Sequence, residues 1–241
     1  MGHPSPDRVV AINRPRIVRT LVVITLVLIA ASLAVDVTAI QTGHDRIFGL
    51  LPLFDLDREG NIPTFFSAVL LLGAGLLCGF AGLLDGQRGG RERNYWRALC
   101  VIFAYLAIDE ASLIHELTIE PMHHLIGNLG PAFRFAWVIP AIVLVGIGGL
   151  LFLRFFLRLP PPIRTRVAIA AIMFVGGSIG FEIISGGYLG AHPGGERNAA
   201  YILIFTTEES LEMFGMIVFI NALLRHIDEF YQAGRWTPSY L

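Results

Sequence analysis

Charge is scarce in this sequence, and lysine is absent. All 18 basic residues are arginines, and charged residues make up only 15% of the 241 positions, against 54% hydrophobic residues. The mean hydropathy is +0.65. This composition excludes an ordinary soluble domain and is typical of an integral membrane protein, whose first partner is the lipid bilayer. The formal net charge of −1 also excludes nucleic-acid binding driven by the charge of the whole chain.

Cysteine is almost absent as well. The two thiols, Cys78 and Cys100, lie in or beside apolar runs, near the ends that we place at the cytoplasm, where disulfides are rare. Neither thiol has a partner at a usable metal-binding spacing. We therefore expect both to be small buried hydrophobic side chains.

Six apolar runs are long enough to cross a bilayer as helices. Most arginines lie in the two tails and in the loops after the second and fourth runs, so the positive-inside rule places these segments in the cytoplasm. The sequence therefore predicts an all-α bundle of six transmembrane helices, with both termini cytoplasmic and no second domain. For the first run, a cleaved signal peptide is the alternative. The predicted spans are residues 20–40, 65–84, 98–117, 135–156, 167–188 and 199–224, with tails at 1–19 and 226–241.

Acidic residues interrupt three of these runs, where charge is unfavourable. A charged side chain at the middle of a spanning helix costs roughly 2.5–3.5 kcal/mol on insertion scales. No lysine or arginine lies in the core of these three runs. The residues concerned are Asp109, Glu110, His115 and Glu116 in the third run, Glu182 in the fifth, and Glu208, Glu209 and Glu212 in the sixth.

Depth and helical spacing predict that these acids meet. Counted from their own loops, they all fall between the membrane middle and its outer surface. At about 100° per residue, acids of one run align on stripes that should face inward, because acids facing lipid are costly. The stripes are Asp109, Ser112, Glu116 and Glu120, then Ser178, Glu182 and Ser185, then Glu208 and Glu212. Three further side chains point elsewhere on this count, namely Glu110, His115 and Glu209.

Converging carboxylates repel one another, so they must be neutralised by bound metal ions, bound protons, a cationic ligand or an outer-loop arginine folded inward (Arg46, Arg134 or Arg197). A bound metal is the sharpest option, because carboxylates with histidine suit iron, manganese or zinc. The expected ligands are Asp109, His115, Glu116, Glu182, Glu208 and Glu212, with Glu209 as the catalytic acid or base. A metal there would support an oxidoreductase or hydrolase acting on a membrane-soluble molecule. The spacing departs from helical di-iron sites, which carry clean Glu-x-x-His pairs.

Two other classes of function stay open. A proton- or cation-coupled transporter would use the acids as proton carriers, but the chain lacks the internal repeats that such folds usually show. A non-catalytic subunit of a larger membrane complex would use them as a structural network of neutral acids and hydroxyls, through which the spans recognise one another.

A separate signal lies in the loop before the second run. Asp55, Asp57 and Glu59, followed by Gly60, reproduce the first half of a calcium-binding EF-hand loop. Phe66 stands where the bidentate glutamate should be. A polar turn leading into a helix start is the alternative.

The acidic segments also carry a resemblance. The runs Asp109-Glu110-Ala111-Ser112 to His115-Glu116, and Glu208-Glu209 to Glu212-Met213 with Gly215, resemble an uncharacterised family of bacterial inner-membrane proteins. The likeness covers most of the chain from about Leu53 onward. The resemblance implies a bacterial inner (plasma) membrane setting and no particular activity.

Overall fold

The structure is a computed structural model that describes residues 13–44, 46–127 and 129–231. Every regular element in these ranges is helical, which confirms the all-α prediction. Most of the predicted N-terminal tail and the end of the predicted C-terminal tail lie outside the described residues. The part of the N-terminal tail from Arg14 onward already belongs to the first helix.

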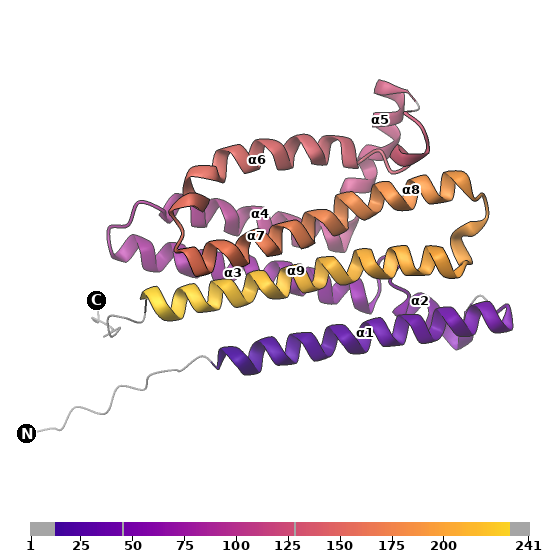
Figure 1. Ribbon diagram of the computed structural model, residues 1–241, viewed down its shortest axis with the longest axis horizontal. Helices are drawn as coiled ribbons and strands as arrows, with labels where there is room; N and C mark the ends of the chain where they lie inside the picture. Colours follow the sequence, from indigo (N-terminus) through magenta and orange to yellow (C-terminus); the bar gives the residue numbers. More distant parts are fainter. Residues whose placement is uncertain (1–12, 45, 128, 232–241) are drawn as a thin grey trace, which may run out of the picture.

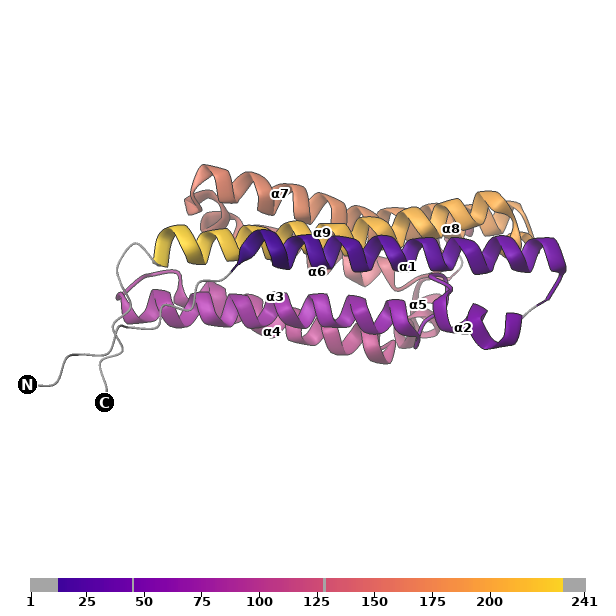
Figure 2. The ribbon, with the colours of Figure 1, turned by 90° about the horizontal axis from the view of Figure 1, so that it is seen from below.

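Long helices run roughly parallel or antiparallel along one axis (Figures 1 and 2). They are α1 (Arg14–Thr42), α3 (Ile62–Gln87), α4 (Arg93–Ser112), α6 (Val138–Arg158), α7 (Pro161–Val175) continued by α8 (Glu182–Ala191), and α9 (Ala199–Tyr231). Short elements connect them: η1 (Ile47–Gly49), α2 (Leu50–Phe54), η2 (His115–Thr118), α5 (Ile119–Ile126), η3 (Pro131–Phe133) and η5 (Gly195–Arg197). The start of α1 and the end of α9 lie at the same end of the bundle.

Several of these helices are long and apolar enough to cross a membrane. Within the described residues four pass on length and composition, namely α1, α3, α6 and the continuous segment Pro161–Ala191, and a fifth counts if α4 and the bent segment after it form one span. Large apolar side chains on these helices are exposed, as at Leu76 (64%) and Leu150 (76%). Such outward-facing apolar surface is what a helix in lipid presents.

The helix α9 lies at the centre of the packing. It contacts α1, α3 and α7, and its inward face buries Met213, Met216 and Leu223. The contact with α7 depends on Gly215, because a Cβ there would lie 2.9 Å from the backbone nitrogen of Phe174 and 3.1 Å from the carbonyl oxygen of Ala170. The chain therefore brings the acids of α9 close to the fifth predicted run through backbone-to-backbone packing.

The loop before α3 is a polar turn. The amide of Asn61 donates to the carbonyl oxygens of Asp55 (2.7 Å) and Arg58 (2.8 Å), while its side-chain oxygen accepts from the Thr64 backbone at 3.1 Å and caps α3. The Arg58 guanidinium donates to the Asp55 carboxylate at 3.1 Å. These bonds form the turn and helix start that the sequence offered as one of its two interpretations, while calcium binding by Asp55, Asp57 and Glu59 stays a prediction.

The third predicted span does not continue as a helix to residue 117. The helix α4 ends at Ser112, Leu113 adopts a left-handed conformation (φ 58°, ψ 36°), and the segment His115–Ile126 is bent by 81° from α4. The backbone N–H of His115 donates to the Asp109 carboxylate at 2.8 Å, which holds the reversal. The expected stripe from Asp109 through Glu116 to Glu120 is therefore wrong.

We predict that Gly215→Val destabilises the protein by about 1–3 kcal/mol, because the added side chain meets the α7 backbone. Gly146→Val on α6 is the matched control, since an added Cβ there meets nothing within 4 Å. Thermal unfolding of the two purified variants in detergent compares them. Equal melting temperatures would contradict the close packing of α7 against α9.

Candidate functional site

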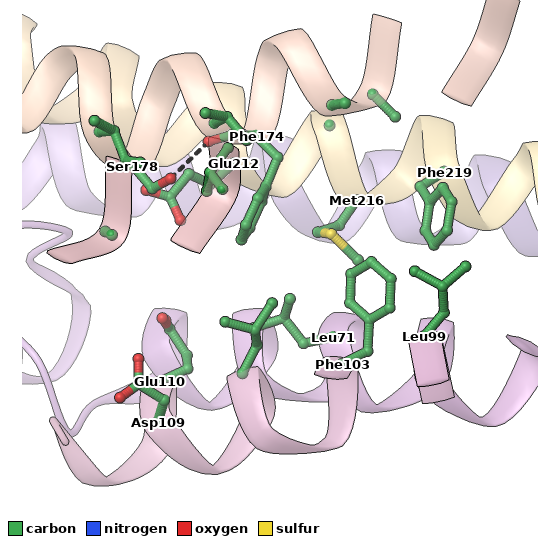
Figure 3. Close-up of a pocket in the computed structure, with 18 of the residues that line it drawn as sticks. Leu71, Leu99, Phe103, Asp109, Glu110, Phe174, Ser178, Glu212, Met216 and Phe219 are labelled. Atoms are coloured by element: carbon green, nitrogen blue, oxygen red, sulfur yellow. Dashed lines mark hydrogen bonds between the residues drawn. The ribbon is translucent and has the colours of Figure 1, made fainter. Parts of the chain in front are cut away.

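A cavity of about 440 Å³ lies between α3, α4, α6, α7 and α9. Figure 3 shows Asp109, Glu110, Ser178 and Glu212 at one end, and Leu99, Phe103, Met216 and Phe219 at the other. The cavity is thus acidic at one end and apolar at the other. The acidic side chains that line it, together with one histidine, are Glu59, Asp109, Glu110, His115, Glu182, Glu208, Glu209 and Glu212.

The α4 side of the acidic end is built by the bend after Ser112. The ring of His115 turns back so that its Nδ1 lies 3.1 Å from the Asp109 carboxylate, and its Nε2 lies 3.9 Å from Glu59. The ring also packs against Trp137, with centroids 4.7 Å apart. Trp137 in turn donates its indole N–H to Glu182 at 3.4 Å. The bend therefore links α4, the loop before α3 and the start of α8 in one polar network.

A π-helical turn over Gly176–Phe181 (η4) shapes the opposite side. A Cβ at Gly177 would lie 2.9 Å from the carbonyl oxygen of Glu208 and 2.9 Å from Cγ of Glu212, so only glycine fits between this turn and α9. The hydroxyl of Ser178 donates to the carbonyl oxygen of Phe174 at 2.9 Å. Single π-turns within α-helices occur frequently at functional sites. Here the turn sets where Glu182 enters the cavity.

The acidic end holds more negative than positive groups. None of the residues that line the cavity is a lysine or arginine, and His115 alone can carry positive charge among them. Glu59 belongs to the loop between α2 and α3. Burial raises the pKa of Glu59 to about 7, and repulsion from Glu116 adds to the rise, while His115 opposes it.

Six of the seven predicted site residues line this cavity: Asp109, His115, Glu182, Glu208, Glu209 and Glu212. The seventh, Glu116, is exposed and does not line it, because the helix that would have carried it inward has ended. His115 and Glu209 were turned elsewhere by the helical count. His115 reaches the cavity because of the bend after Ser112, and Glu209 lines it from α9.

Two lining acids were missed as site residues. Glu110 was expected to point away from the Asp109 stripe, yet both acids face the cavity in Figure 3. Glu59 was considered only as part of a half EF-hand loop or a polar turn, and nothing in the sequence brings that segment to the third run. The adjacency of Glu110 to Asp109 in an apolar run was the one available signal for it.

The lining acids do not form a ready-made metal centre. Within the described ranges, no group of three or more His, Cys, Asp or Glu side chains is arranged to hold a metal ion. Figure 3 shows Glu110 of α4 facing Glu212 of α9 across the open space of the cavity. The acids therefore share one cavity without sharing a coordination sphere in this arrangement.

The fold and the cavity define a class of helical proteins with several potentially membrane-crossing helices and a half-acidic, half-apolar interior cavity. Residues 13–227 match the family model described as "Domain of unknown function (DUF8692)", so the chain belongs to this family. No curated protein and no solved structure matches the chain.

An acid–hydroxyl pair connects the loop before α3 to α9. Tyr201 donates its hydroxyl proton to Asp57 at 2.9 Å and accepts a bond from Ser185 at 3.4 Å. Asp57 is exposed as a whole residue, yet desolvation of its carboxyl group raises its pKa to about 6; the bond from Tyr201 opposes the rise, and repulsion from Asp55 adds to it. The folded protein therefore holds a proton on Asp57 more tightly than the unfolded chain does.

Because the pKa of Asp57 is raised on folding, the stability that this group contributes is complete below about pH 4 and is lost as the pH rises through 6. We predict that the melting temperature of Asp57→Asn falls less between pH 4 and pH 7 than that of the unmodified protein. Glu120→Gln, at a fully accessible acid (87% exposed), should leave the pH dependence unchanged. Parallel pH profiles of Asp57→Asn and the parent protein would refute this assignment.

Proposed function

We propose that the protein is a multi-pass integral membrane protein whose cavity binds a positive species between its acids, in the first place a transition-metal ion. The one observation that carries the proposal is that seven carboxylates and one histidine from four segments of the chain line one cavity without a lysine or arginine. Carboxylates with histidine suit iron, manganese or zinc.

Repulsion between the ionised carboxylates favours a bound cation. Ionised carboxylates in apolar surroundings are unfavourable unless they are paired, coordinated or protonated. Seven such groups around one cavity of about 440 Å³ repel one another strongly if they are all charged. One histidine cannot balance them, so the site has to acquire positive charge from solution.

The proposal assigns roles to the residues. Glu182, Glu208, Glu212 and Asp109 are the ligand candidates, with His115 as the nitrogen donor. Glu209 is the acid or base beside them. To bind one ion, the carboxylates of α4 and α9 have to approach more closely than they do here. A metal ion at this place would supply redox chemistry or activate water toward a membrane-soluble molecule.

One observation favours a second candidate. Since the acids do not already form a coordination sphere, protons are the alternative neutralising species, as in proton-coupled transporters. The two candidates differ in what co-purifies with the protein. A site neutralised by protons retains no metal.

We predict that protein purified without chelators retains iron, manganese or zinc in a fixed ratio to the chain, measured by elemental analysis. Glu212→Gln should lower the bound metal roughly tenfold or more, because losing even an outer partner of a metal ligand costs about that much. Glu120→Gln is the matched control, since Glu120 is 87% exposed and does not line the cavity. No retained metal in the parent protein would favour protons instead, and equal loss of metal in both variants would contradict Glu212 as a ligand.

We also propose six membrane crossings with both termini in the cytoplasm of a bacterial cell, as the arginine distribution predicts. The prediction is tested by cysteine labelling with a membrane-impermeant maleimide, after Cys78→Ala and Cys100→Ala. Gln41→Cys, in the last turn of α1, should be labelled when only the outer face is accessible. Arg91→Cys, before α4, should be labelled only after the membrane is opened. Labelling of both, or of Arg91→Cys alone, contradicts the orientation.

A further inference from the structure

The helix α6 is held at its two ends. At its C-terminal end, Phe155 stacks on Tyr95 (5.2 Å between centroids) and meets Trp96 edge-on (4.9 Å), while Arg158 pairs with Glu92 at 2.8 Å. Just before its N-terminal end, Trp137 joins the polar network of the acidic end. These contacts fix the ends of α6 against α4 and α8.

The middle of α6 has little packed against it. An added Cβ at Gly146, Gly148 or Gly149 would meet nothing within 4 Å. At 100° per residue these three positions point in different directions around the helix, so the gap in packing is not confined to one face. Only 11% of the residues in the apolar stretch of α6 are buried. Figure 1 shows the middle of this helix set apart from α7.

The wall of the cavity is thin beside this part of α6. Val145 lines the cavity and is 44% exposed, and Ala171 on α7 both lines the cavity and is exposed. Little packs against the middle of α6 to thicken this wall. The easiest passage into the cavity therefore lies between the middle of α6 and α7, on a side that faces hydrocarbon in a membrane-spanning bundle.

Several aromatic rings line the apolar part of the cavity, beside aliphatic side chains. The rings come from four helices and include Phe103, Phe152, Phe155, Phe174 and Phe219. A volume of about 440 Å³ is within the range of roughly 300–1,000 Å³ that single small-molecule ligands occupy. Rings of this kind offer no hydrogen-bond partner, so they suit a hydrocarbon chain and not a polar solute.

We infer that the cavity takes a single-chain, lipid-like molecule that enters sideways from the bilayer between α6 and α7, with its chain among the phenylalanines and its polar head at the acids. The inference names the substrate class of the proposed site and rests on the proposed function. A passage toward hydrocarbon selects molecules already dissolved in the membrane. The acids then sort those molecules by their head groups.

Tryptophan fluorescence tests this inference, because Trp96 and Trp137 both line the cavity and Trp96 is only 2% exposed. Trp236→Phe removes the third tryptophan of the chain. The Trp236→Phe variant is placed in unbrominated phosphatidylcholine nanodiscs and titrated with a dibrominated long-chain alcohol. Its bromines quench tryptophan fluorescence on contact. The uncharged head makes binding independent of whether a metal is present. We expect saturable quenching.

A matched pair of variants on α6 separates the cavity from the outer surface. Val145→Phe fills this passage and should weaken the saturable quenching about tenfold. Leu144→Phe, at a neighbouring residue that is 68% exposed and does not line the cavity, should leave it unchanged. Quenching that never saturates, or that responds equally in both variants, overturns the inference. Elemental analysis of the same samples measures the bound metal separately. Failure of metal binding can therefore be distinguished from failure of the lipid-like molecule to bind.

Discussion

The structure depends on one constraint, which is that many like-charged carboxylates share an apolar interior that contains almost no basic groups. Each acid alone could be satisfied by a neighbouring hydroxyl or backbone group. Around one cavity the acids have to be neutralised together, because each ionised carboxylate makes ionisation of its neighbours less favourable. The bend after α4, the π-turn before α8 and the glycine contacts of α9 all serve to bring these groups to one place.

Local backbone geometry places the polar side chains of the cavity. Gly177 and Gly215 let α7 and its π-turn approach α9, which fixes Glu208 and Glu212 at the cavity. The left-handed residue Leu113 turns the chain so that His115 faces back toward Asp109. Both features use local backbone geometry to place polar side chains where a straight helix would not. The apolar remainder of the cavity follows from the aromatic residues that these same helices carry.

Apolar runs sufficed to predict the helices of this chain, because length and hydropathy are properties of the local sequence. The convergence of Asp109, Glu182 and the α9 acids was also predictable, since helical spacing puts them at similar depth. The break at Leu113 was not predictable. Leucine does not favour the left-handed conformation, which is stabilised here by the hydrogen bond between Asp109 and His115. For the same reason Glu116 was misplaced, and Glu59 was missed because a loop far away in sequence folds over the cavity.

The central claim is that a bound cation, and not a set of protons, neutralises the acids. Infrared spectroscopy of the purified protein tests it most directly, because protonated carboxylic acids and ionised carboxylates absorb at separate frequencies. The account predicts that the carbonyl band of buried protonated acids is weak as purified and grows when a chelator removes the metal, with Glu212→Gln reducing that growth. A strong protonated-acid band from the start, unaltered by chelator, would contradict it.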